Sequence, residues 1–68
     1  MEIPKQYNPQ DVITKLNDIQ WEKYEYEDFV VVLKNRVRKF TGLDEVMFYS
    51  DEQLVEKLIE LEIVTIKG

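Results

Sequence analysis

The fold class is decided by residues 29 to 42, FVVVLKNRVRKFTG. Large apolar residues recur there at helical spacing over four turns: Phe29, Leu33, Val37 and Phe40. Gly42 follows, where a left-handed glycine commonly ends a helix. Against this, three consecutive valines starting at Val30 favour a strand. Because the periodic signal covers the longer stretch, we predict a helix over residues 26 to 41, with strand in residues 20 to 33 as the alternative.

Two further helices are indicated by their start signals. Asn8 is a capping residue before Pro9, and proline is favoured at the first helical position. The apolar residues that follow keep a single face, which predicts a helix over residues 8 to 19. Ser50 and Gln53 have the spacing of a reciprocal capping box. An apolar stripe follows them as well, and it predicts a helix over residues 50 to 62.

The two ends of the chain carry no helical period. Residues 1 to 7 include Pro4 and read as an extended arm, whereas residues 63 to 68 begin with the β-branched run Ile63-Val64-Thr65-Ile66. A lone strand is not stable, so this tail must pair with residues 46 to 49, pair with another chain, or pack as extended chain. We favour pairing with a second copy, which predicts a homodimer.

These elements predict one small domain over residues 1 to 68: a mainly α, three-helix domain with a short C-terminal β-type tail. The alternative is an α+β domain with a two-stranded ribbon, similar in arrangement to a winged helix. The longest apolar run has five residues, far short of the roughly 20 that a spanning helix needs. The N-terminus lacks the order of a signal peptide, so we expect a cytoplasmic protein that does not bind membranes.

Composition argues against an enzyme. The chain contains no cysteine and no histidine, which excludes disulfides, thiolate nucleophiles, Cys/His zinc sites and imidazole catalysis. Glu52, Glu56 and Glu60 share one helical face, but catalysis by carboxylates requires burial, and the apolar stripe of that helix lies elsewhere. No glycine-rich phosphate loop is present. We therefore expect no catalytic residues, no metal and no cofactor.

Charge is strongly segregated along the chain, whose net charge is -5. A cluster of four basic residues, Lys34, Arg36, Arg38 and Lys39, lies between acidic segments. In the simplest interpretation, Lys34 and Arg38 lie near the acidic face of the third helix and relieve its repulsion. In the functional interpretation that face binds a protein with a basic surface, and so inhibits or regulates it. The residues of this acidic face are Glu45, Glu52, Glu56 and Glu60.

Two other groups of residues have two interpretations each. The basic cluster could contact nucleic acid phosphates, which makes a small nucleic-acid-associated regulator the alternative function, although the net charge disfavours it. Trp21, Tyr24 and Tyr26 fall in a segment without a clear period. Aromatic residues of a small domain are more often core, so we expect core positions, with a partner-facing aromatic patch as the alternative.

Overall fold

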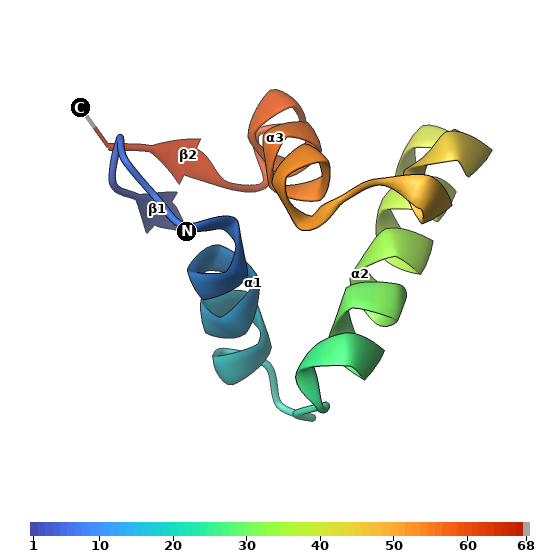
Figure 1. The fold of residues 1–68 in the computed structure, drawn as a ribbon, viewed down its shortest axis with the longest axis horizontal. Helices are drawn as coiled ribbons and strands as arrows, with labels where there is room; N and C mark the ends of the chain where they lie inside the picture. Colours follow the sequence, from blue (N-terminus) through green and yellow to red (C-terminus); the bar gives the residue numbers. More distant parts are fainter. Residues whose placement is uncertain (68) are drawn as a thin grey trace.

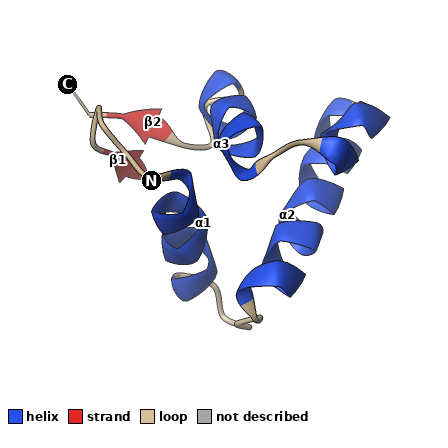
Figure 2. Cartoon of the chain, viewed as in Figure 1, coloured by secondary structure: helices blue, strands red, loops and turns tan. Residues whose placement is uncertain are grey.

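The structure, a computed structural model, describes residues 1–67 and confirms a mainly helical three-helix domain (Figure 1). The elements follow one another as β1 (Glu2–Ile3), α1 (Pro9–Asp18), α2 (Tyr26–Thr41), the 3-10 helix η1 (Asp44–Phe48), α3 (Asp51–Glu60) and β2 (Thr65–Ile66). Helices dominate, and the only strands over residues 1–67 are the two short ones near the chain ends (Figure 2). None of the helices in this part of the chain is long and apolar enough to cross a membrane.

The start signals of α1 and α3 act as predicted. The Asn8 side chain accepts a hydrogen bond of 2.9 Å from the Gln10 amide, with Pro9 as the first helical residue. At α3, the Gln53 amide donates to Ser50 Oγ at 3.2 Å, and the Ser50 amide donates to Gln53 Oε1 at 2.9 Å. Each cap satisfies amides that have no partner within the helix. Both helices therefore begin where local sequence places them.

The capping box makes a testable prediction about stability. Replacing Ser50 by alanine removes the acceptor of the Gln53 amide, so the free energy of unfolding is expected to fall by about 1 kcal/mol. Urea denaturation monitored by circular dichroism measures this change. Ser50→Asp is the control, because it keeps a side-chain acceptor and should stay close to the unsubstituted chain. An unchanged midpoint for Ser50→Ala would contradict the role of the cap.

Helix α2 spans Tyr26–Thr41 as predicted, so the three valines are helical rather than strand. Phe29, Leu33 and Val37 are buried, while Phe40, the last member of the same stripe, is 70% exposed. Gly42 ends the helix with a φ of 76°, and its amide donates to the carbonyl of Arg38 at 2.7 Å. Glycine adopts this left-handed conformation at little steric cost, which explains the stop.

Helix α3 ends at Glu60, two residues before the predicted end. The Ile63 amide donates to the Leu58 carbonyl and the Glu62 amide to the Ile59 carbonyl, both at 3.0 Å. These two bonds form a Schellman motif, with Glu62 at the left-handed position (φ 61°) that glycine usually occupies. The turn redirects the chain from α3 toward β1 (Figure 1).

The predicted partners of the C-terminal tail were wrong. Residues 46 to 49 lie in and just after η1, and β2 pairs instead with β1, in parallel, with Glu2 opposite Thr65 and Ile3 opposite Ile66. The Thr65 amide donates to the Met1 carbonyl at 2.9 Å, and the Lys67 amide donates to the Ile3 carbonyl at 2.8 Å. Because the tail finds its partner within the chain, the argument for a homodimer through an unpaired tail no longer holds. The oligomeric state itself stays a prediction.

One core collects side chains from every helix and from both ends of the chain. Helix α1 contacts both α2 and α3, and η1 packs against α2. No polar or charged residue of the described chain is fully buried. The buried residues are Ile3, Val12, Ile13, Phe29, Leu33, Val37, Val46, Leu54, Val55, Leu58 and Val64.

Candidate functional site

The chain's single tryptophan lies outside the core. Trp21, in the loop between α1 and α2, is fully exposed, at 102% of its reference area. The predicted core position was therefore wrong for this residue. Tyr24 and Tyr26 are half-buried, and the ring of Tyr24 stacks on that of Phe29 with centroids 6.4 Å apart. Tyr24 and Phe29 thus supply the aromatic packing that was expected of Trp21.

The loop that carries Trp21 is anchored on both sides of it. The Asn17 amide donates from Nδ2 to the Tyr24 carbonyl at 2.7 Å, and Asn17 Oδ1 accepts from the Tyr24 amide at 3.1 Å. On the other side, Arg36 Nη1 of α2 donates to Gln20 Oε1. These bonds tie the two ends of the loop to α1 and α2, so the exposed indole projects from a loop that is anchored on both sides.

Carboxylates flank Trp21 on both sides in the sequence. Residues 18 to 28 contain five acidic residues and one lysine, which amounts to -4 of the chain's net -5. All five carboxylates are exposed, and none of them forms an ion pair within residues 1–67. Glu27 and Asp28 lie in the first turn of α2, where they also stabilise the positive end of the helix dipole. The indole therefore belongs to a strongly negative segment of the chain. The acidic residues are Asp18, Glu22, Glu25, Glu27 and Asp28.

Tyr26 is engaged inside the fold. Its hydroxyl donates to Asp51 Oδ2 at 2.8 Å, which joins the start of α2 to the start of α3. Burial raises the pKa of Tyr26 well above its ordinary value of 10.0, and the hydrogen bond and negative charge of Asp51 raise it further. Of the three aromatic candidates, only Trp21 is therefore fully free to contact a partner.

The Tyr26 hydroxyl makes a prediction about alkaline stability. Because the pKa of Tyr26 in the folded chain lies above its ordinary value of 10.0, the contribution of the hydroxyl to the free energy of unfolding is fully present below about pH 10. It is lost as the pH rises from there through the folded pKa. Tyr26→Phe should lower the free energy of unfolding by about 1 kcal/mol at neutral pH. Between neutral pH and about pH 11, the free energy of unfolding should then decrease less for this variant than for the unsubstituted chain. Urea titrations at both pH values measure this. Tyr7→Phe is the control, and an equal effect from it would contradict the prediction.

The predicted acidic face of α3 is exposed but carries its own lysine. Glu52, Glu56 and Glu60 of α3 all lie at the surface, and so does Glu45, which the structure places on η1 rather than on α3. Lys57 Nζ donates to Glu60 Oε2 at 2.9 Å, and this bond raises the pKa of Lys57, with a further contribution from Glu45. This is the one ion pair in residues 1–67, so the predicted relief by Lys34 and Arg38 of α2 is not observed. Glu52 and Glu56 remain without a cationic partner in that part of the chain.

The four basic residues of α2 do not form one patch. With 3.6 residues per turn, Lys34 and Arg38 share one side of the helix, and Arg36 lies on roughly the opposite side. Arg36 is also hydrogen-bonded to Gln20. A nucleic acid backbone on one face of α2 could not meet all four residues together.

No cluster of metal-ligating side chains occurs in the described part of the chain. The site-forming features are therefore the anchored Trp21 loop, the negative surface around it and the exposed acidic face of α3. Comparisons of the chain with protein-family models, with curated proteins and with solved structures found no match.

Proposed function

We propose that this chain is a non-catalytic protein-interaction module that binds, and thereby inhibits or regulates, a partner with a basic surface. The observation that carries the proposal is the full exposure of Trp21 on an anchored loop. A tryptophan exposes a large apolar area to water, and burying it against a partner is favourable. Tryptophan is also enriched among the residues that dominate binding energy at interfaces. Because the loop is already anchored, the entropy lost on binding is mainly that of the Trp21 side chain rather than of the loop backbone.

The chemistry of the partner follows from the charges around the indole. Five exposed carboxylates favour a surface rich in arginine and lysine, and complementary fields accelerate encounter. An arginine or lysine of the partner could also stack on the Trp21 ring as a cation–π contact. The acidic face of α3, with Glu52 and Glu56 unpaired among the described residues, offers such a partner a second negative surface.

Nucleic acid binding through α2 has less support. Lys34, Arg38 and Arg36 point to different sides of the helix, and the carboxylates of the chain would repel phosphates. A titration with nonspecific DNA at low and high salt tests this alternative. Measurable affinity that falls steeply with salt would favour it over the protein-interaction module.

The environment of Trp21 predicts how its fluorescence is quenched. Relative to free N-acetyltryptophanamide, an exposed indole among carboxylates should be quenched more by Cs⁺ and less by iodide, because the local field attracts cations and repels anions. The difference should vanish in about 1 M sodium chloride, where the Debye length is about 3 Å. Trp21 is the only tryptophan, so Stern–Volmer plots report this site alone. A ratio of Cs⁺ to iodide quenching equal to that of free N-acetyltryptophanamide at low salt would contradict the described surface.

Binding is tested with matched variants of two exposed aromatic residues. The immobilised chain, Trp21→Ala and Phe48→Ala are each used to capture proteins from an extract of the source cell, and purified candidates are then titrated against all three. Phe48 is 87% exposed on η1 and serves as the control. We expect a basic protein that binds the unsubstituted chain and Phe48→Ala, loses about tenfold or more in affinity with Trp21→Ala, and shifts the Trp21 emission to the blue. Equal affinity for Trp21→Ala would overturn the proposal.

A further inference from the structure

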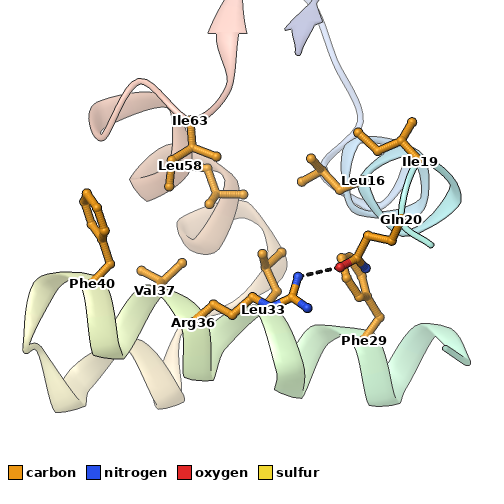
Figure 3. A pocket seen from close by; sticks show the side chains of 10 residues that line it. All are labelled: Leu16, Ile19, Gln20, Phe29, Leu33, Arg36, Val37, Phe40, Leu58 and Ile63. Atoms are coloured by element: carbon orange, nitrogen blue, oxygen red, sulfur yellow. Dashed lines mark hydrogen bonds between the residues drawn. The ribbon is translucent and has the colours of Figure 1, made fainter. Parts of the chain in front are cut away.

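A second surface, separate from Trp21, forms an open apolar groove along α2 (Figure 3). Its volume is about 450 Å³, and its walls come from the end of α1, from α2 and from the end of α3 with the residue that follows the Schellman motif. Ile19 and Phe40 are each 70% exposed at its rim, and Ile63 is 43% exposed. Three large apolar side chains around one groove make a patch of the kind that marks interaction sites.

One polar group in the groove has no partner. The carboxamide oxygen of Gln20, Oε1, accepts a hydrogen bond from Arg36 Nη1. The carboxamide nitrogen, Nε2, does not take part in this bond. That nitrogen is buried and has no hydrogen-bond acceptor within residues 1–67. A buried donor without an acceptor costs free energy. Gln20 Nε2 is closed to water in this conformation, so the carboxamide must turn toward the groove before an oxygen of an occupant can satisfy it. Arg36 lines the same groove and adds positive charge there.

The walls select a helical occupant over an extended one. Most of them are side chains on helices, and the amides of Ile19, Gln20 and Ile63, which lie beyond the helix ends, are also hydrogen-bonded within the chain. An extended peptide would therefore find few backbone partners and would leave its own amides unsatisfied. A helix satisfies its backbone internally and needs only an apolar face. One side of the groove is open to water, whereas binding sites for small molecules usually enclose most of the ligand surface. An alkyl ligand would therefore stay partly exposed to water here, but a bound amphipathic helix could direct its polar face to the open side.

The length of the groove agrees with this choice. Phe29 and Phe40 both line it, and eleven residues along α2 correspond to about 16 Å, or about three helical turns. Apolar residues at i, i+4 and i+7 of an amphipathic helix, the usual spacing of helix-in-groove recognition, span about 10 Å and therefore fit within this length.

We propose that this groove binds an amphipathic helix of another protein, which carries apolar residues at i, i+4 and i+7 and a glutamate or aspartate that accepts hydrogen bonds from Gln20 Nε2 and Arg36. The site goes beyond the proposed function, because Trp21 is not among its walls and because Arg36, the charged residue on those walls, favours an acidic group rather than a basic one. The chain would then have two binding surfaces of opposite charge preference.

The experiment is a selection from a displayed library of helical peptides about 14 residues long, or about four turns. The bait is the unsubstituted chain, with Phe40→Ser as the counter-selection and Phe48→Ser as the control at an exposed phenylalanine outside the groove. Enriched peptides should carry the apolar i, i+4, i+7 pattern with one acidic residue, and should bind Phe40→Ser at least about tenfold more weakly than Phe48→Ser. Trp21→Ala should bind them normally, which separates this test from that of the proposed function.

A double-mutant cycle then tests the polar contact. Replacing the acidic residue of the best peptide by leucine should weaken binding to the unsubstituted chain by about fivefold or more, and should have little effect on Gln20→Met. Equal weakening on both would overturn the role of Gln20. Any one of three results would overturn the assignment of a helical occupant. The first is that no peptide is enriched over the Phe40→Ser counter-selection. The others are displacement of the bound peptide by decanoate at a concentration below the peptide's own dissociation constant, and self-association of the chain that Phe40→Ser abolishes.

Discussion

Phe29→Ala is expected to leave much of the chain unfolded at room temperature. Phe29 is 1% exposed, stacks on Tyr24 and lines the floor of the groove between the three helices. Removing a buried phenylalanine ring costs about 3 to 5 kcal/mol, because the transfer energy is lost and a cavity remains. A domain of 68 residues has a total stability of about 3 to 10 kcal/mol. The substitution therefore removes a large part of what holds the fold.

Phe48→Ala is the matched control for this prediction. Phe48 is 87% exposed on η1, so the same chemical change there should alter the free energy of unfolding by less than about 0.5 kcal/mol. Guanidinium titrations of the three proteins, monitored by far-ultraviolet circular dichroism, give the comparison. Similar midpoints for Phe29→Ala and Phe48→Ala would mean that α2 does not pack through Phe29.

Ile3→Ala is expected to be the second most damaging substitution of those considered. Ile3 is 2% exposed, and it belongs to the same buried cluster as Val64, which precedes β2 and is 0% exposed. Truncation of a buried isoleucine to alanine costs about 2 to 5 kcal/mol. The N-terminal arm should detach as a result, because its two-residue strand has little other support.

The control for the arm is its register partner. Ile66 lies opposite Ile3 in the sheet but is 43% exposed, so Ile66→Ala should cost much less. Thermal unfolding monitors both variants, and hydrogen exchange of the Thr65 and Lys67 amides reports the strand pair directly. If Ile3→Ala changed neither stability nor exchange, the arm would not be part of the core.

The helices could be predicted because their signals are local. The Asn8 cap, the Ser50 and Gln53 capping box, and Gly42 each act within one turn of their own position, and the structure places all three as expected. The periodic stripes also identified which face of each helix is apolar. They could not tell how far a partner element covers that face, and this is why Ile19 and Phe40 are exposed at the groove.

The features that were missed depend on distant parts of the chain. Pairing of β1 with β2 joins segments more than 60 positions apart, and neither two-residue strand carries enough pattern to predict the other. The exposure of Trp21 depends on Tyr24 and Phe29 packing together and on the Asn17 bonds that hold the loop. The early end of α3 depends on Glu62 accepting a left-handed conformation that its side chain does not favour.

The candidate site was predicted in part. Segregation of charge and the exposure of Glu45, Glu52, Glu56 and Glu60 follow from composition and helical spacing. The pairing of Lys57 with Glu60 was missed, although the i, i+3 spacing of the two residues is visible in the sequence. The groove and the unpaired Gln20 amide could not be found without the packing of three helices, because their residues come from separate parts of the chain.

The parallel pairing of β1 and β2 determines how the chain responds to a pulling force. The force enters β1 from its start at Met1 and leaves β2 beyond its end at Lys67. Traction on the two ends therefore slides the strands past each other and loads the bonds from Thr65 to Met1 and from Lys67 to Ile3 together. Two antiparallel strands with their free ends side by side would instead peel apart one bond at a time. A chain held at both ends should consequently resist tension at this short sheet until both bonds break at once.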